Sequence, residues 1–395
     1  MHDGIIQDYL IMKCLLIVPR WSEQESVFPP SGRPYLDLQL ECLGFAEMGF
    51  SELEPDAPFD PTRVAEEYQL ILIQGTVGPG NRLRRSLLSS LGLSLGLDSD
   101  ESDRLRVMGA RPLYDAEGIP AGFAIKRRGR MVIYCEKSIW GLRRELTAAI
   151  REFMDEGIVD SQGMTRRGRY RTCWMVEGSE EEIAALVEES DLRLCRIRAL
   201  ANGDSAIMLP AQVGAEFKER MQACLGERLY AKSPRPLEVL VGRQLREANA
   251  SITVAESCTG GLIAARLSAV PGSSAYLSVG YVTYANAAKS QCLDVGAVLI
   301  ERCGAVSPEV ALAMARGALR HSGASMAVSV TGIAGPDGGS EEKPVGTVYL
   351  AAVSQQGDVL EHKALYQGSR DRVRYQASQT ALHLFRRLLR RRQPE

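Results

Sequence analysis

Residues 254–261 read Val-Ala-Glu-Ser-Cys-Thr-Gly-Gly, and residues 262–267 continue as Leu-Ile-Ala-Ala-Arg-Leu. The pattern predicts a strand that ends at Ser257, a glycine turn, and a helix that opens at Gly261. Helix amino termini carry unpaired N–H groups that stabilise anions and oxyanions. Two interpretations stay open: a catalytic hydroxyl beside an anion site, or a simple cap made by Ser257 or Thr259, since Ser and Thr are preferred caps.

Length and charge limit the class of protein. The chain has 395 residues, more than one typical core, so two or three domains are expected. Its 47 Lys+Arg balance 49 Asp+Glu, and we therefore expect neither nucleic acid nor a membrane as a partner. Nine cysteines include no Cys-x-x-Cys pair, which is typical of a reducing compartment and offers no zinc framework. The apolar stretch at residues 10–19 is too short to span a bilayer, so we expect a cytoplasmic protein.

The first segment has the pattern of a parallel α/β domain, expected over residues 1–160. Apolar runs of strand length occur at residues 14–19 and 70–74, and the second leads into a glycine loop at residues 75–80. Further strands are predicted at residues 122–126 and 130–134, and helices at residues 83–91 and 141–156.

The second segment, residues 161–232, is predicted to be a small α+β connector. A basic run at residues 165–171 precedes a strand at residues 172–176, a helix at residues 180–189 and a strand pair that ends near Leu209. The basic run is interpreted as a solvated face, with phosphate binding as the alternative. Ser-Pro-Arg-Pro at residues 233–236 marks the next boundary.

The third segment, residues 233–395, alternates strands and helices, which predicts a layered α/β/α domain. Ligands of such sheets bind at the carboxyl ends of the strands. Helices are predicted at residues 237–247 and 261–268, on either side of residues 303–304, and from Arg370 onward; strands are predicted at residues 251–255, 277–284, 326–331, 347–354 and 359–366.

Histidine is scarce, which constrains the catalytic chemistry. The four histidines are His2, His321, His362 and His383, and none lies in a glycine-rich loop. A Ser-His-Asp triad and a histidine-rich metal site are therefore poorly supported. A nucleophilic serine in this chain needs a different base.

Lys289 is the candidate base. It follows the strand end at Tyr284 and lies in the first turn of a helix that Asn286 is expected to cap. A lysine near a helix amino terminus has its charged form disfavoured, so its pKa should fall toward a value suited to general-base catalysis. Tyr284 is a candidate for orienting a ring or relaying a proton. Taken alone, each residue also fits a purely structural role.

A glycine-rich loop at residues 331–346 is the second feature with chemical potential. It follows a buried strand and can bring backbone N–H groups close to a phosphate or carboxylate, although it matches neither the Walker nor the Rossmann pattern. Arginines at the start of the last helix could clamp a phosphate, although that helix is basic along its length. Cys258 is a competing nucleophile, since a thiol at a helix amino terminus would be acidified.

Several motifs in the third segment resemble the CinA family, whose carboxyl-terminal domain is nicotinamide mononucleotide deamidase. The resemblance covers residues 237–389 and rests on Ala-Glu-Ser-Cys-Thr-Gly-Gly at 255–261, Val-Thr-Tyr-Ala-Asn at 282–286, Gly-Ala-Val-Ser at 304–307, Gly-Ile-Ala-Gly-Pro-Asp-Gly-Gly at 332–339, Glu-Lys-Pro-Val-Gly-Thr-Val at 342–348 and Gly-Ser-Arg-Asp at 368–371.

The resemblance implies a metal-free and cofactor-free hydrolysis of the nicotinamide carboxamide by a Ser and Lys pair. Ser257 would attack the amide, Lys289 would act as the base, and Tyr284 would help to position a ring or relay a proton. It also implies that the glycine loop and the start of the last helix hold the ribose phosphate. The substrate-binding residues that it implies are Thr259, Gly260, Gly261, Thr331, Gly332, Gly335, Gly338, Gly339, Arg370 and Arg374.

The first segment resembles the amino-terminal domain of the same family, which is similar to molybdopterin-binding proteins and hydrolyses ADP-ribose with a metal. The family loop Gly-Gly-x-Gly-Pro-Thr-x-Asp-Asp reads Gly-Thr-Val-Gly-Pro-Gly-Asn-Arg-Leu at residues 75–83, so both acids are replaced. The Pro-Gly-Pro-Pro-x-Glu element is likewise replaced at residues 135–140. Because a divalent metal needs oxygen ligands, we expect a degenerate domain that serves as scaffold or for dimerisation.

These observations predict a nicotinamide mononucleotide amidohydrolase of pyridine nucleotide recycling that acts on a small-molecule nucleotide and forms a homo-oligomer, namely a dimer. Two alternatives stay open. One is a non-catalytic nucleotide-binding or regulatory protein, and the other is residual ADP-ribose pyrophosphatase activity.

Overall fold

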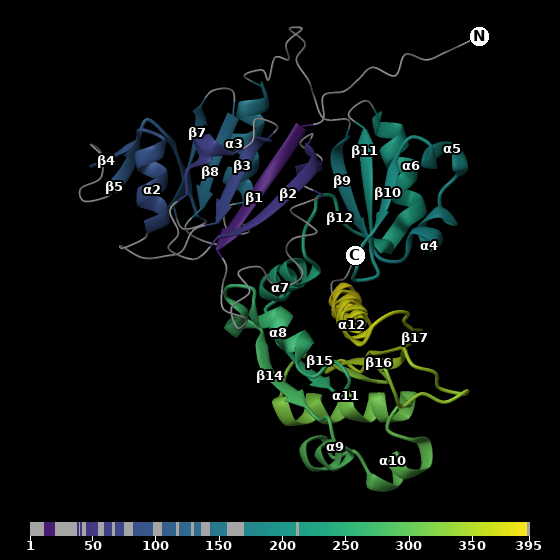
Figure 1. The fold of residues 1–395 in the computed structure, drawn as a ribbon. Helices are drawn as coiled ribbons and strands as arrows, with labels where there is room; N and C mark the ends of the chain where they lie inside the picture. The colour runs from purple at the N-terminus through teal and green to yellow at the C-terminus, as the bar shows by residue number, and fades with distance from the viewer. Residues whose placement is uncertain are drawn as a thin grey trace. The chain divides into compact units, whose positions relative to one another are not determined.

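The computed structural model describes residues 12–19, 38, 40–41, 45–53, 59–64, 68–74, 82–97, 105–115, 118–127, 130–135, 143–155, 170–210 and 213–392. They fall into two compact units of mixed α/β structure. Figure 1 shows their helices and strands. One unit lies within Met1–Cys173 and Met208–Gly214, and the other within Trp174–Ile207 and Ala215–Glu395. The three domains with boundaries near residues 160 and 232 remain a prediction.

A six-stranded sheet forms the centre of the first unit, in the order β2-β1-β3-β8-β7-β6. Strands β2, β1, β3 and β8 run parallel, and β7 and β6 are antiparallel additions. The strands are β1 Met12–Pro19, β2 Phe45–Leu53, β3 Tyr68–Gln74, β6 Arg111–Tyr114, β7 Pro120–Arg127 and β8 Arg130–Cys135, with a separate hairpin of β4 Ser94–Leu97 and β5 Leu105–Met108.

Helices cover both faces of this sheet, which explains why β3 is apolar at consecutive positions. Leu70 and Leu72 pack in one core with α3 (Arg143–Asp155), whereas Ile71 and Ile73 pack in another with α2 (Arg82–Ser90). A short 3₁₀ helix, η1 Pro61–Arg63, precedes β3. The predicted strands and helices of this segment are confirmed, while β2, β4, β5 and β6 were not predicted. The loop at residues 75–81, residues 136–140 and the basic residues 165–169 lie outside the described residues.

A four-stranded sheet, β10-β11-β9-β12, follows with its short helices. The helix predicted at residues 180–189 is wrong, because Glu188 is extended and divides it into two helices. The break lets Asp191 turn inward and pair with Arg220 at 2.8 Å. The elements are β9 Tyr170–Val176, α4 Glu180–Ala184, α5 Glu189–Leu192, β10 Arg196–Ala199, β11 Ser205–Pro210, α6 Ala215–Leu225, η2 Gly226–Arg228 and β12 Leu229–Ala231.

The last sheet has the order β14-β13-β15-β16-β17, with β13 parallel to β14 and β15 and the rest antiparallel. Helix α11 packs on one face, and α12, yellow in Figure 1, lies on the other with α7 and α8. This confirms the predicted layered α/β/α arrangement. The elements are α7 Leu237–Glu247, β13 Ile252–Glu256, α8 Leu262–Ser268, η3 Ser273–Ala275, β14 Leu277–Val282, α9 Asn286–Leu293, α10 Ala297–Cys303, α11 Pro308–Ser322, β15 Met326–Gly332, β16 Thr347–Ser354, β17 Val359–Leu365 and α12 Arg370–Arg392.

Buried polar side chains of α12 join this domain to the four-stranded sheet. Arg386, 1% exposed, donates to the Glu177 carboxylate at 2.8 Å. His383 Nε2 lies 3.1 Å from both carboxylate oxygens of Asp204, and Gln379 donates to the same carboxylate. Because Arg386, His383 and Gln379 each contact a carboxylate of the sheet, these contacts specify how the sheet and α12 pack.

Candidate active site

Ser257 lies at the carboxyl end of β13, a strand that runs parallel to both its neighbours. Its N–H donates to the carbonyl of Val330 in β15 at 2.9 Å, and the residue is only 8% exposed. Residues 257–261 then form a tight bend, which we call the nucleophile turn. The position agrees with the rule that ligands of α/β sheets bind beyond the carboxyl ends of the strands.

Lys289 lies directly beside this serine. Its Nζ is 3.1 Å from Ser257 Oγ, 3.0 Å from the carbonyl of Thr283 and 3.1 Å from the carbonyl of Tyr284. The side chain is buried, and desolvation of the ammonium lowers its pKa below the ordinary value. The predicted direction of the pKa shift is confirmed, but burial is its main cause.

The cap expected for this helix is wrong. Ala285, in an extended conformation, is the N-cap of α9, no side chain caps it, and Asn286 is its first residue. Lys289 therefore lies one turn into the helix, where its long side chain reaches back to the strand end.

The contacts of Lys289 accommodate both protonation states of its amine. As an ammonium, Nζ donates to the Ser257 hydroxyl and to both backbone carbonyls; as a neutral amine, it donates to the two carbonyls and its lone pair is left for the Ser257 hydroxyl proton. A neutral lysine in this position can accept the proton of a serine as that serine attacks a carbonyl carbon. The arrangement therefore provides the contact that a serine nucleophile and a lysine base would require.

The amino terminus of α8 is not the open anion site that the sequence predicted. The buried carboxylate of Glu256 accepts the N–H groups of Gly261, Ile263 and Ala264 at 3.0, 3.1 and 2.9 Å. Thr259 does not cap the helix either: the N-cap is Gly261 in the left-handed conformation, and the Thr259 hydroxyl is buried without a partner among the described residues. Sequence reasoning missed Glu256, whose signal is a carboxylate at the end of a strand that a glycine turn joins to the next helix.

Cys258 is a poor nucleophile. Burial raises the pKa of its thiol to about 12, and the nearby Glu256 carboxylate acts in the same direction. The expected acidification by the helix terminus is wrong, because the Glu256 carboxylate already occupies those N–H groups.

Hydrogen bonds connect two arginines of α12 to Tyr284, to the glycine loop and to the nucleophile turn. Arg370, which is exposed, donates to the carbonyl of Gly335 at 2.8 Å and to the Tyr284 hydroxyl at 2.7 Å. Arg374 donates through Nε and Nη2 to the carbonyl of Thr259 at 3.2 and 2.9 Å. Hydrogen bonds thus join Arg370 to the predicted catalytic residue Tyr284 and Arg374 to the predicted substrate-binding residue Thr259.

Only part of the glycine loop at residues 331–346 is connected to these arginines by hydrogen bonds. Gly335 is linked to Arg370, whereas the hydrogen bonds of the described residues show no such link for Gly338 or Gly339. Gly332 lies where a Cβ would meet the carbonyl oxygen of Thr347 at 2.8 Å, so glycine is required there for strand packing. Thr331 is buried, and its hydroxyl donates to the carbonyl of Ala305 at 2.8 Å.

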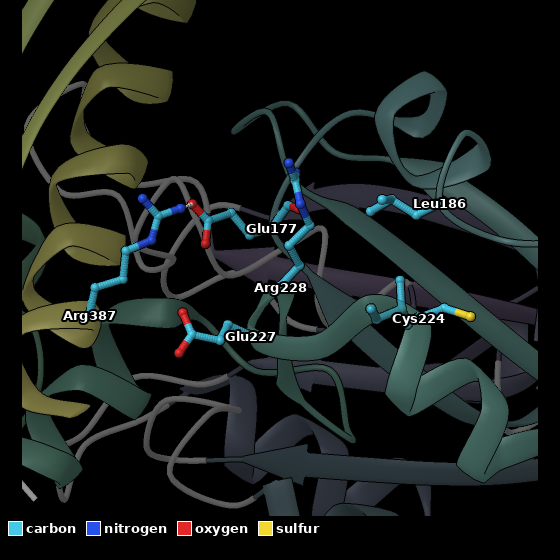
Figure 2. Close-up of a pocket in the computed structure, with 7 residues that line it drawn as sticks. Glu177, Leu186, Cys224, Glu227, Arg228 and Arg387 are labelled. Carbon is cyan, nitrogen blue, oxygen red and sulfur yellow. Dashed lines mark hydrogen bonds and ion pairs between the residues drawn. The ribbon is translucent and has the colours of Figure 1, made fainter. Parts of the chain in front are cut away.

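A hollow of about 340 Å³ lies elsewhere in the second unit, at the carboxyl end of β9. Figure 2 shows residues that line it. Arg387 reaches its rim from α12 and pairs with Glu177. None of the predicted site residues lines it. Among the described residues, no group of three or more His, Cys, Asp and Glu side chains is placed to hold a metal ion. Searching the same part of the chain for a helix long and apolar enough to cross a membrane finds none.

Comparison with known proteins assigns the family. Residues 235–389 match the model of the CinA C-terminal domain. A putative competence-damage inducible protein of Moorella thermoacetica is 32% identical over 354 residues, which are 81% of this chain and 84% of that protein. The chain belongs to the CinA family. Its candidate site residues, from Ser257 to Arg374, all lie inside the segment that matches the CinA C-terminal domain.

Other CinA relatives match over shorter stretches. A CinA-like protein of Citrifermentans bemidjiense is 46% identical over 213 residues, 54% of this chain and 49% of the relative, so the chain spans about half the length of that protein. The crystal structure of competence/damage inducible protein CihA from Agrobacterium tumefaciens is 44% identical, with 39% of this chain and 96% of that chain covered and a TM-score of 0.38.

Proposed function

We propose that this CinA protein is an amidohydrolase that converts nicotinamide mononucleotide to nicotinate mononucleotide and ammonia in pyridine nucleotide recycling. The observation that carries the proposal is the 3.1 Å separation of Lys289 Nζ and Ser257 Oγ. Membership of the CinA family supports it, as does the location of the pair beyond the carboxyl end of a parallel strand.

In the proposed reaction, Ser257 Oγ attacks the carboxamide carbon while its proton passes to the neutral amine of Lys289. The lysine ammonium then protonates the amide nitrogen as the C–N bond breaks, which releases ammonia and leaves a nicotinoyl ester on Ser257. Water attacks the ester with Lys289 again as base; the C–Oγ bond breaks as the lysine ammonium returns the proton to Ser257 Oγ, and the product leaves as the carboxylate. The carbonyls of Thr283 and Tyr284 hold the amine throughout.

We assign the phosphate of the substrate to Arg370 and the backbone of the glycine loop. Each Nη of Arg370 makes one hydrogen bond to Gly335 or Tyr284, so a guanidinium with five N–H donors retains several for an anion. Thr331 is less suited than the sequence suggested, because its single hydroxyl proton is donated to Ala305.

For the amino-terminal segment we propose a scaffold role. Leu83, which replaces the second acid of the family loop, is 1% exposed and packs with Leu87 in the core under the sheet. A buried leucine cannot supply an oxygen ligand, which supports the loss of metal-dependent ADP-ribose hydrolysis.

An ammonia-release assay with nicotinamide mononucleotide tests the proposal directly. We expect turnover by the wild type and loss of it in Ser257→Ala and Lys289→Ala. Binding without turnover, unaffected by Lys289→Ala, would instead support a regulatory nucleotide-binding protein. Metal-stimulated hydrolysis of ADP-ribose would contradict the scaffold role.

A further inference from the structure

The nucleophile turn contains two glycines in the left-handed region, Gly260 at φ 60° and Gly261 at φ 92°. Glycine adopts these conformations without a steric penalty, but it loses more conformational freedom on folding than other residues do, so ordering this turn costs free energy. Within the turn, Gly260 N–H donates to the carbonyl of Ser257 at 3.0 Å. The 3.1 Å contact between Ser257 and Lys289 therefore depends on what holds the turn from outside.

Glu256 holds the turn at its first end. The carboxylate is 0% exposed and binds three N–H groups of the α8 amino terminus. Its backbone carbonyl also accepts the N–H of Thr283 at 2.8 Å. One residue thus ties the serine to the helix that follows it and to the segment whose carbonyls bind Lys289.

Arg374 holds the turn at its centre. Its Nε and Nη2 both donate to the carbonyl of Thr259, while Nη1 makes a 3.4 Å contact with the exposed Asp371. The Nε–Nη2 edge of the guanidinium, the edge suited to bidentate binding, is thereby engaged with the protein itself. Arg370, one turn earlier on α12, makes no bond to the turn among the described contacts and meets Tyr284 and Gly335 instead.

We infer that Glu256 and Arg374 are positioning residues, which keep Ser257 within reach of Lys289, and that Arg374 is not a ligand of the substrate phosphate. The inference rests on the proposed amidase function. Since a misplacement of about 1 Å can cost about 10²-fold in rate, loss of either residue should act on kcat.

The test compares nicotinamide mononucleotide with nicotinamide riboside, which lacks the phosphate. Arg374→Ala should lower kcat for both substrates by a similar factor, on the order of 10²-fold, with KM unchanged. Arg370→Ala should raise KM for the mononucleotide alone. Arg372→Ala, an exposed arginine between them on α12, is the matched control and should behave as wild type.

Two results would overturn the inference. In the first, Arg374→Ala raises KM for the mononucleotide and leaves the riboside unaffected, which makes Arg374 a phosphate ligand. In the second, Arg374→Ala leaves kcat for both substrates unchanged. Glu256→Gln is the second variant: it keeps one oxygen acceptor and places an amide group against N–H donors, so a partial loss of kcat is expected.

A substrate-independent readout separates this inference from the proposed function. A fluorophosphonate labels an activated serine, and mass spectrometry gives the rate of labelling at Ser257. If the wild type releases no ammonia from either substrate, the amidase proposal fails, yet slower labelling of Arg374→Ala than of Arg372→Ala still supports positioning. Equal labelling rates would contradict it.

Discussion

Lys289 Nζ lies 3.1 Å from Ser257 Oγ although 32 positions separate the two residues in the chain. The serine ends β13, and the lysine lies on the helix after β14, the strand that pairs in parallel with β13. Parallel pairing brings the two carboxyl ends to one edge of the sheet, and the buried lysine reaches back across it.

The rate of amide hydrolysis should depend on the protonation of Lys289. Only the neutral amine can accept a proton, and burial lowers its pKa below the ordinary value of about 10.4. We therefore expect kcat/KM to rise with pH and to level off at a pH below that value. Lys289→Ala should lower kcat by about 10²–10⁴-fold and remove this limb of the profile. A pH-independent rate in the wild type between pH 6 and about 10 would contradict the assignment.

The stability of the fold should also depend on Lys289. Its pKa is lower in the folded than in the unfolded chain, so between those two pKa values the unfolded chain binds more protons. The free energy of unfolding should therefore rise with pH through this range and stop rising near the unfolded value of about 10.4. Urea denaturation at several pH values measures this change in the free energy of unfolding. Lys289→Met should lose this contribution, whereas the same change at the exposed Lys363 should retain it.

Cys258 should be unreactive in the folded protein. Its thiol is buried with a pKa raised to about 12, so the thiolate is scarce at pH 8. Iodoacetamide followed by mass spectrometry should modify the exposed Cys224 and Cys292 and spare Cys258 until the chain unfolds. Cys258→Ala should retain amidase activity. If the Cys258→Ala protein folds but has no amidase activity, the thiol becomes a candidate nucleophile again.

Glu177 should be important for stability. Arg386 is buried and pairs with this carboxylate, so Glu177→Ala leaves an unpaired buried charge. Breaking such a pair costs about 3–5 kcal/mol of unfolding free energy. Fluorescence of the buried Trp174, three residues away in β9, can follow urea denaturation. Glu189→Ala removes the partner of Arg193 in an exposed pair and should leave the midpoint nearly unchanged.

The layers of the fold could be predicted because local patterns encode them. The apolar run at residues 70–74 predicts a buried strand, and the pattern after residue 237 predicts alternating strands and helices. The structure confirms both predictions. The strand and turn at Ser257 follow from the same patterns, and the scarcity of histidine points to Lys289. The helix predicted at residues 180–189 was wrong because the chain breaks at Glu188, where local propensity favours continuation.

The amino-acid sequence contains the chemical groups of the site: a serine at a strand end, a lysine in the helix after the neighbouring strand, and arginines at the start of the last helix. How these groups are used depends on the packing of the folded chain. It places the Glu256 carboxylate on the α8 amino terminus, raises the Cys258 pKa by burial, and directs Arg374 to Thr259 and Arg370 to Tyr284. Propensity acts between neighbours in the chain, whereas hydrogen bonding and desolvation depend on groups that only packing brings together.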